Sequence, residues 1–194
     1  MRRDREGLRA HYDLGPLIRQ ASHLAERAMR RLGHVPPTLL AETATGFVAY
    51  SPTHLPDEQA KDSFANTSRL IALGYRAKAI ALVLESWMTL AKPGQILDPG
   101  VPPSESPERQ ECVFILAEAA ETHGGRILKI ERDKQGAFIR LEEIPMPDGV
   151  TGEGRFSQIM PPRTPSEQDS KIARQLLSDL GVTPERCDFE PGRN

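Results

Sequence analysis

Ala79-Ile80-Ala81-Leu82-Val83-Leu84 and Cys112-Val113-Phe114-Ile115-Leu116-Ala117 are the two apolar runs that decide the fold of this 194-residue chain. Neither run alternates with polar residues, which is typical of strands that lie in the middle of a sheet and are buried on both faces. A loop rich in proline, serine and charge joins them. We therefore predict that the two runs are neighbouring central strands.

Residues 78–143 are predicted to form a four-strand antiparallel meander that begins with these two strands. Thr122-His123-Gly124-Gly125 predicts the turn after the second strand, and residues 126–132 alternate between apolar and charged side chains. Asp133-Lys134-Gln135-Gly136 predicts a hairpin loop, because glycine suits the left-handed position of such a loop. Residues 137–142 then supply the return strand.

Two helices and a β-hairpin precede the meander. Apolar residues recur at helical spacing over residues 14–32 and again over residues 57–73, where Gly74 is expected to end the second helix. Between the helices, residues 38–43 and 46–50 predict a hairpin with a short turn. The predicted fold class is therefore α+β: a mostly antiparallel sheet made of this hairpin and the meander, with both helices covering one of its faces.

The composition changes after Ile144. We predict a single domain over residues 1–144, a Pro/Gly-rich linker over 145–165, an amphipathic C-terminal helix over 166–181 and a tail over 182–194. Thr164-Pro165-Ser166-Glu167 is typical of a capping box, with proline at the first helical position.

The bulk composition excludes several classes of protein. A net charge of -2 argues against a protein dominated by nucleic-acid binding. The two cysteines, Cys112 and Cys187, are too few for a disulfide framework or a zinc site, and both are expected to be reduced. The basic N-terminus is followed by no apolar segment of the kind that a secretory signal has, and no apolar run approaches the length of a membrane helix. A cytoplasmic location is therefore expected.

Common catalytic and cofactor motifs are missing from the sequence. It contains no G-x-x-x-x-G-K-[ST], no G-x-S-x-G and no H-E-x-x-H pattern. His54, Asp57 and Glu58 form a close group of potential metal ligands, but no other histidine has matching spacing. A role for this group in the turn and helix cap is favoured. No cofactor and no metal site are predicted.

A polar cluster is predicted where the two central strands are joined. In an antiparallel pair, the end of the first strand lies beside the start of the second. Glu85 and Trp87 therefore come close to Arg109 and Glu111, under a loop that contains Ser104.

Two interpretations of this cluster are open. In the functional one, Glu85 and Glu111 act as acid and base or hold a cation, and Arg109 receives an anion. Trp87, Ser104 and Arg109 are then the binding residues. In the structural one, Arg109 pairs with one or both glutamates and fixes the loop, with Trp87 packed beneath it.

The same residues carry a resemblance. Glu85-Ser86-Trp87-Met88, followed after a gap by Pro103-Ser104-Glu105-Ser106-Pro107-Glu108-Arg109-Gln110-Glu111, is similar to a pattern in uncharacterised bacterial proteins. There it reads E-A-W-M and then P-S-x-x-P-x-R-x-E, so Ser86 stands where alanine is expected. The resemblance covers only this part of the chain. It implies a bacterial origin, with phages and mobile elements included, and no particular activity.

Three functions are compatible with the sequence. The leading hypothesis is a non-enzymatic binding or regulatory module that acts through protein–protein contacts or self-association, using its sheet and its C-terminal helix. The alternative is a small hydrolase or metal-assisted enzyme that uses Glu85, Arg109 and Glu111. The third is weak nucleic-acid binding through the arginine-rich face of the first helix, formed by Arg19, Arg27, Arg30 and Arg31.

Overall fold

The fold is α+β, as predicted, with a seven-stranded antiparallel sheet in the order β6-β5-β4-β3-β1-β2-β7. It is seen in a computed structural model that describes residues 12–91, 94, 98, 100–145 and 155–187. The strands are β1 (Thr38–Thr43), β2 (Gly46–Tyr50), β3 (Ala79–Met88), β4 (Gln110–Ala119), β5 (Thr122–Arg132), β6 (Phe138–Ile144) and β7 (Glu185–Cys187). The helices are α1 (Gly15–Leu32), α2 (Glu58–Gly74), α3 (Glu167–Asp179) and the short 3-10 helix η1 (Pro103–Glu105).

The two apolar runs form β3 and β4 at the centre of the sheet, which confirms the prediction. Leu82 of β3 and Ile115 of β4 are completely buried. β3 pairs with β4 on one side and with β1 on the other, so the first hairpin extends the meander into one continuous sheet.

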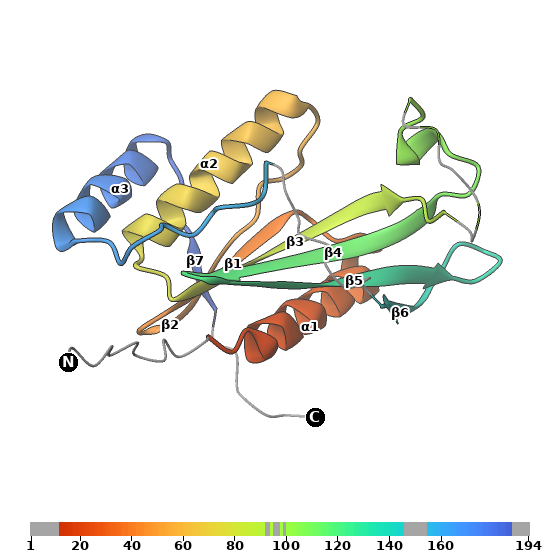
Figure 1. Ribbon diagram of the computed structural model, residues 1–194, viewed down its shortest axis with the longest axis horizontal. Helices are drawn as coiled ribbons and strands as arrows, with labels where there is room; N and C mark the ends of the chain where they lie inside the picture. Colours follow the sequence, from red (N-terminus) through yellow and green to blue (C-terminus); the bar gives the residue numbers. More distant parts are fainter. Residues whose placement is uncertain (1–11, 92–93, 95–97, 99, 146–154, 188–194) are drawn as a thin grey trace, which may run out of the picture.

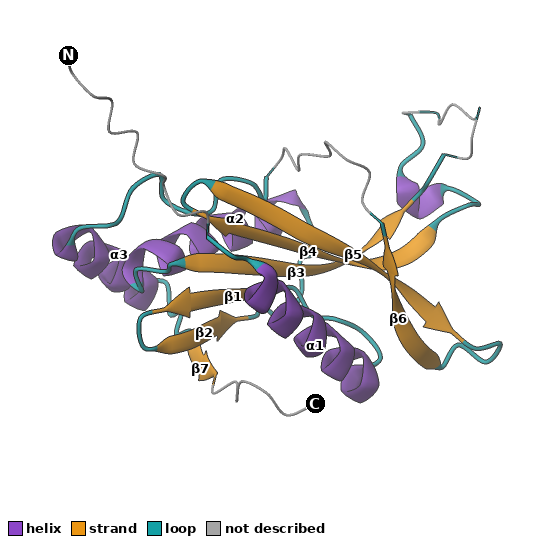
Figure 2. Ribbon diagram, turned by 60° about the horizontal axis from the view of Figure 1, so that its bottom comes forward, coloured by secondary structure: helices purple, strands orange, loops and turns teal. Residues whose placement is uncertain are grey.

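The helices lie on both faces of the sheet, so the prediction that they share one face is wrong. Leu17 and Ala21 of α1 pack with Ala81 and the other odd-numbered residues of β3. Phe64 of α2 packs with the even-numbered residues, such as Leu82, on the opposite face. A strand that is apolar on both faces needs a covering layer on each. Figure 1 shows α2 and α3 above the sheet and α1 below it, and Figure 2 shows α1 across the near face.

Two glycine positions have a packing role where the sequence predicted turns. The predicted turn at residues 122–125 belongs to β5, and the chain reverses at residues 120–121 instead. A Cβ on Gly125 would lie only 2.5 Å from the carbonyl oxygen of Ile115 in β4. Gly74 is the last residue of α2, where a Cβ would lie 3.4 Å from the backbone nitrogen of Arg174 in α3 and 3.1 Å from its Cγ. Both glycines allow two backbones to approach closely.

The second half of the predicted linker is part of the core. Residues 155–160, which we call the strap, run past α2, and Ile159 is buried. The carboxylate of Glu118, buried in β4, accepts hydrogen bonds from the backbone of Ile159 at 2.8 Å and of Met160 at 3.1 Å. On the other side, the guanidinium of Arg69 donates to the carbonyl oxygen of Ser157. Residues 146–154 of the predicted linker lie outside the described residues.

The C-terminal part differs from the prediction in three more respects. Residues 185–187 of the predicted tail form β7, which pairs with β2. The cap of α3 is Ser166 with Asp169, not Thr164 with Glu167, and Pro165 precedes the cap. α3 packs against α2 through Ala173 and Leu177, whereas three further apolar residues of the predicted amphipathic helix stay exposed: Ile172 at 51%, Leu176 at 45% and Leu180 at 63%.

Candidate functional site

Two of the predicted site residues, Glu85 and Glu111, lie together on the face of the sheet that α1 covers. Trp87 of β3 is the direct partner of Glu111 in β4, and Glu85 is two residues away on the same face. The two carboxyl groups are within hydrogen-bonding reach of each other. Glu85 also accepts a hydrogen bond from the backbone N–H of Val35 at 2.6 Å, in the connection between α1 and β1.

The residue that neutralises this pair is Arg132, not Arg109. Arg132 donates from Nε and Nη2 to the two carboxylate oxygens of Glu111, at 2.8 and 3.1 Å. It also donates to the carbonyl oxygens of Gly33, at 3.2 Å, and Gly136, at 3.4 Å. We call Glu85, Glu111 and Arg132 the carboxyl cluster. The alternation of β5 gives a signal that could have identified Arg132, because it follows Leu128 and Ile130 on the buried face.

Arg109 belongs to a separate group. Its guanidinium stacks over the ring of Trp87 at 4.8 Å from the ring centre and donates to the carbonyl oxygen of Ser104 at 2.6 Å. A cation over an indole ring is an attractive contact. These three residues therefore anchor the η1 loop on β3, which matches that part of the structural interpretation. The predicted pairing of Arg109 with the glutamates is wrong.

The carboxyl cluster changes the acidity of Glu85. Burial raises the pKa of the Glu85 carboxyl above its ordinary value, the hydrogen bond from Val35 partly opposes this, and the charge of Glu111 raises the pKa further. The raised pKa means that the Glu85 carboxyl binds a proton more tightly than an ordinary glutamate does, whereas both oxygens of Glu111 bind Arg132.

Glu85 also lines a pocket at the end of the sheet. This sheet-end pocket has a volume of about 700 Å³ and is lined by residues 34, 36–37, 53–55, 61, 84–86, 116 and 155–157. Its walls come from the connections before β1 and before α2, from α2 itself, from β3 and β4, and from the strap. The strap residues could not be assigned to a site from sequence, because nothing local to them indicates which strand they cross.

Charged groups lie at the α2 side of the sheet-end pocket. Lys61 and Arg155 line it, and both pair with Glu58. Nε of Arg155 also lies 2.6 Å from a carboxylate oxygen of Asp62. The two acids are more exposed than the bases: 69% for Glu58 and 60% for Asp62, against 39% for Lys61 and 30% for Arg155.

The group of His54, Asp57 and Glu58 does not come together as ligands of a metal. Asp57 is the N-cap of α2 and accepts a hydrogen bond from the backbone of Ala60 at 2.7 Å. His54 lines the sheet-end pocket. Within the described part of the chain, no three or more His, Cys, Asp or Glu side chains are grouped so that they could hold a metal ion.

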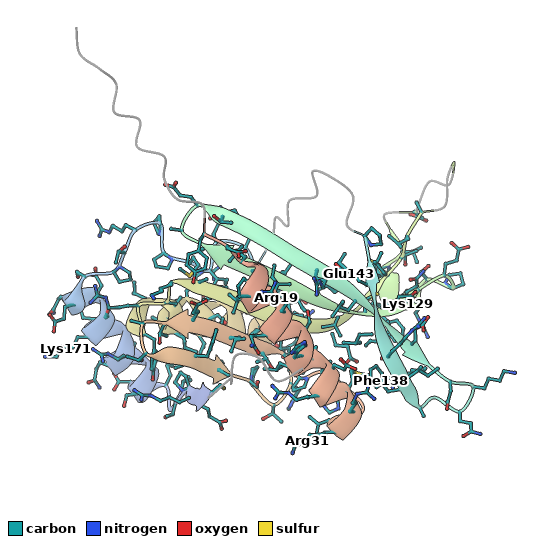
Figure 3. The ribbon with its side chains drawn as sticks, turned by 90° about the horizontal axis from the view of Figure 1, so that it is seen from below. Arg19, Arg31, Lys129, Phe138, Glu143 and Lys171 are labelled. Carbon is teal, nitrogen blue, oxygen red and sulfur yellow. The ribbon has the colours of Figure 1, made fainter. Side chains whose placement is uncertain are left out.

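The arginine-rich face of α1 is partly engaged in contacts within the protein. Arg30 binds Glu26 at 2.6 Å and its guanidinium lies over the ring of Phe138, 5.5 Å from the centre. Figure 3 shows Arg19 and Arg31 toward opposite ends of α1. Nucleic-acid binding through this face stays a prediction.

Comparison with protein-family models, with curated proteins and with solved structures finds no match for this chain. The resemblance to bacterial proteins with the E-[AS]-W-M pattern stays a prediction. Among the described residues, no helix combines the length and the apolar character needed to cross a membrane.

Proposed function

We propose that the protein is a non-enzymatic, cytoplasmic binding module whose ligand site is the sheet-end pocket. The observation that carries this proposal is the pocket itself, with a volume of about 700 Å³. Pockets of roughly 300–1,000 Å³ with mostly apolar walls and a few polar groups are typical of sites for small molecules. Pro36, Pro37, Leu55, Leu84 and Phe156 supply apolar wall here.

A small hydrolase, the alternative, finds less support because its three residues lie in two places. Glu85 and Glu111 belong to the carboxyl cluster with Arg132, whereas Arg109 stacks on Trp87. General acid–base catalysis needs its groups within reach of one reacting atom. Glu85, with its raised pKa, is the feature that favours an enzyme.

Blocking the pocket tests the proposal. N-phenyl-1-naphthylamine, a neutral dye that fluoresces in apolar surroundings, is expected to bind the wild-type protein. Ser86 is exposed and lines the pocket, so Ser86→Phe fills space there without changing the core and is expected to abolish binding. Ser104→Phe, at an exposed serine in η1, is the matched control and should bind as wild type does. Equal titrations for the two variants, or no binding to wild type, would contradict the proposal.

A protein–protein contact through α3 is the second candidate, favoured by its exposed apolar row of Ile172, Leu176 and Leu180. The row has equal spacing, so a second copy of the chain in antiparallel orientation would place Leu176 against its own copy and Ile172 against Leu180. Such a two-fold contact is self-complementary. It is small for a stable dimer, so we expect weak association.

Sedimentation equilibrium checks this contact. The wild-type protein is expected to associate reversibly at high concentration, and Leu176→Lys is expected to be a monomer. Leu90→Lys, at an exposed leucine after β3, is the control and should associate as wild type does. A wild-type protein that stays monomeric at every concentration removes this candidate. Truncation before the strap would be uninformative, since Ile159 and Leu177 are part of the core.

A further inference from the structure

We propose that the ligand of the sheet-end pocket is an amphipathic organic anion, with an apolar body and one carboxylate, sulfonate or phosphate group. This inference rests on the proposed function, because it assigns a chemical class to the ligand of the same pocket. It follows from the positions of the apolar, cationic and acidic side chains around the pocket.

The apolar body is indicated by the pocket walls. Pro36 and Pro37 on the β1 side, Leu84 and Leu116 on the sheet, and Phe156 on the strap all line the pocket. The ring of Phe156 packs edge-on against the ring of Phe64 in α2, with the ring centres 6.0 Å apart. A ring or a branched chain in the ligand would therefore have apolar contacts on several sides. Burial of apolar surface is the main source of affinity in such sites.

The anionic group is indicated by Lys61 and Arg155. Both line the pocket, whereas their acidic partners Glu58 and Asp62 do not. The ion pairs with these more exposed acids therefore hold the side chains of Lys61 and Arg155 at the pocket. A guanidinium has five N–H donors, more than its contacts with two carboxylates use, so it can bind a further anion.

A cationic ligand is disfavoured by the position and contacts of Glu85. Glu85 is the one acidic residue among the described residues that line the pocket, and its side chain lies on the face of the sheet that α1 covers. One of its oxygens accepts the N–H of Val35, and the carboxyl group is in contact with Glu111. The carboxyl group of Glu85 is therefore already engaged on the α1 side, whereas Lys61 and Arg155 line the pocket, so the charge that the pocket offers a ligand is mostly positive.

A pair of fluorescent probes tests the inference. 8-Anilinonaphthalene-1-sulfonate has the same aromatic body as N-phenyl-1-naphthylamine and adds one negative charge. We expect the wild-type protein to bind the sulfonate about tenfold more tightly than the neutral dye, the effect of one charge-assisted hydrogen bond. Ser86→Phe should abolish binding of both probes, which places them in the pocket.

Substitution of Arg155 and Lys61 tests whether these residues cause the tighter binding of the sulfonate. Arg155→Gln is expected to weaken binding of the sulfonate about tenfold and to change binding of the neutral dye less than about twofold. Lys61→Gln, which leaves the strap intact, should weaken binding of the sulfonate in the same direction. Arg140→Gln is the matched control, because Arg140 is also paired with a glutamate, at 2.8 Å, and does not line the pocket.

The outcomes separate the inference from the proposed function. Equal affinity for the two probes overturns the inference and leaves the pocket as a binding site. An equal loss of both probes in Arg155→Gln also overturns it, since Arg155 would then act by shaping the wall. Absence of binding by both probes contradicts the proposed function and the inference together.

Discussion

Gly125→Ala is expected to destabilise the protein by about 3 kcal/mol, the upper part of the usual range for overpacking. The new Cβ would lie 2.5 Å from the carbonyl oxygen of Ile115, and this neighbour is backbone of the central strand β4. A flexible side chain could move away, but β4 is held by hydrogen bonds to β3 and β5 on its two sides. The free energy of unfolding, from urea denaturation, measures the loss.

Gly124→Ala is the control for this substitution. A Cβ on Gly124 would lie 3.5 Å from Cδ1 of Leu14 and 3.6 Å from Cδ1 of Ile18, which are ordinary contacts. We expect its stability to lie within about 0.5 kcal/mol of wild type. If the two variants lose the same stability, the close approach of β5 to β4 is not the reason that glycine occupies position 125.

Arg132→Met is expected to destabilise the protein by about 2 kcal/mol at neutral pH, less than for a fully buried ion pair. The substitution keeps much of the side-chain volume but leaves the carboxyl groups of Glu85 and Glu111 in contact without a cation. Arg132 and Glu111 are 27% and 21% exposed, so solvent screens part of the loss. Arg140→Met removes a cation from an exposed pair and should cost less than about 0.5 kcal/mol. Equal losses in the two variants would contradict this role of Arg132.

The carboxyl cluster also predicts how stability depends on pH. Folding raises the pKa of Glu85 above its ordinary value of 4.5, so the folded state binds the proton more tightly than the unfolded state. This contribution to stability is complete below the ordinary pKa and is lost as the pH rises through the raised pKa. Glu85→Gln keeps an acceptor for Val35 and imitates the neutral carboxyl.

Glu85→Gln should therefore be as stable as wild type near about pH 4 and more stable near about pH 8. In the background of Arg132→Met, the same substitution should recover part of the lost stability, because only one carboxylate is then left in the cluster. Thermal denaturation of the four proteins across this range measures both effects. A pH dependence in Glu85→Gln equal to that of wild type would exclude Glu85 as its source.

The sequence predicted those parts of the fold that depend on local patterns. The central strands were identified by unbroken apolar runs, and the loop at Asp133 by its turn residues. Gly136 has the expected positive φ of 84°, and the side chain of Asp133 accepts hydrogen bonds from the backbone of Gln135 and Ala137. Such signals involve residues that are neighbours in the chain, so one sequence is enough to interpret them.

The candidate site was predicted only in part, for a physical reason. Glu85 and Glu111 could be placed together because consecutive strands joined by one loop pair antiparallel. The end of the first strand then lies beside the start of the second. The arginine that binds them did not follow. Arg109 directly precedes β4 and Arg132 ends the neighbouring strand β5, so either one could have paired with Glu111. In the structure Arg132 binds Glu111, whereas the guanidinium of Arg109 stacks over the ring of Trp87.

The sequence by itself determined the α+β class, the central position of β3 and β4, the hairpins and the meeting of Glu85 with Glu111. All of these follow from side-chain periodicity and the connection of consecutive strands. Tertiary structure alone decided that α1 and α2 cover opposite faces and that the strap crosses to Glu118. It also decided that Lys61 and Arg155 line one pocket with Glu85. These arrangements join segments far apart in the chain, and no local pattern specifies which distant surface a segment packs against.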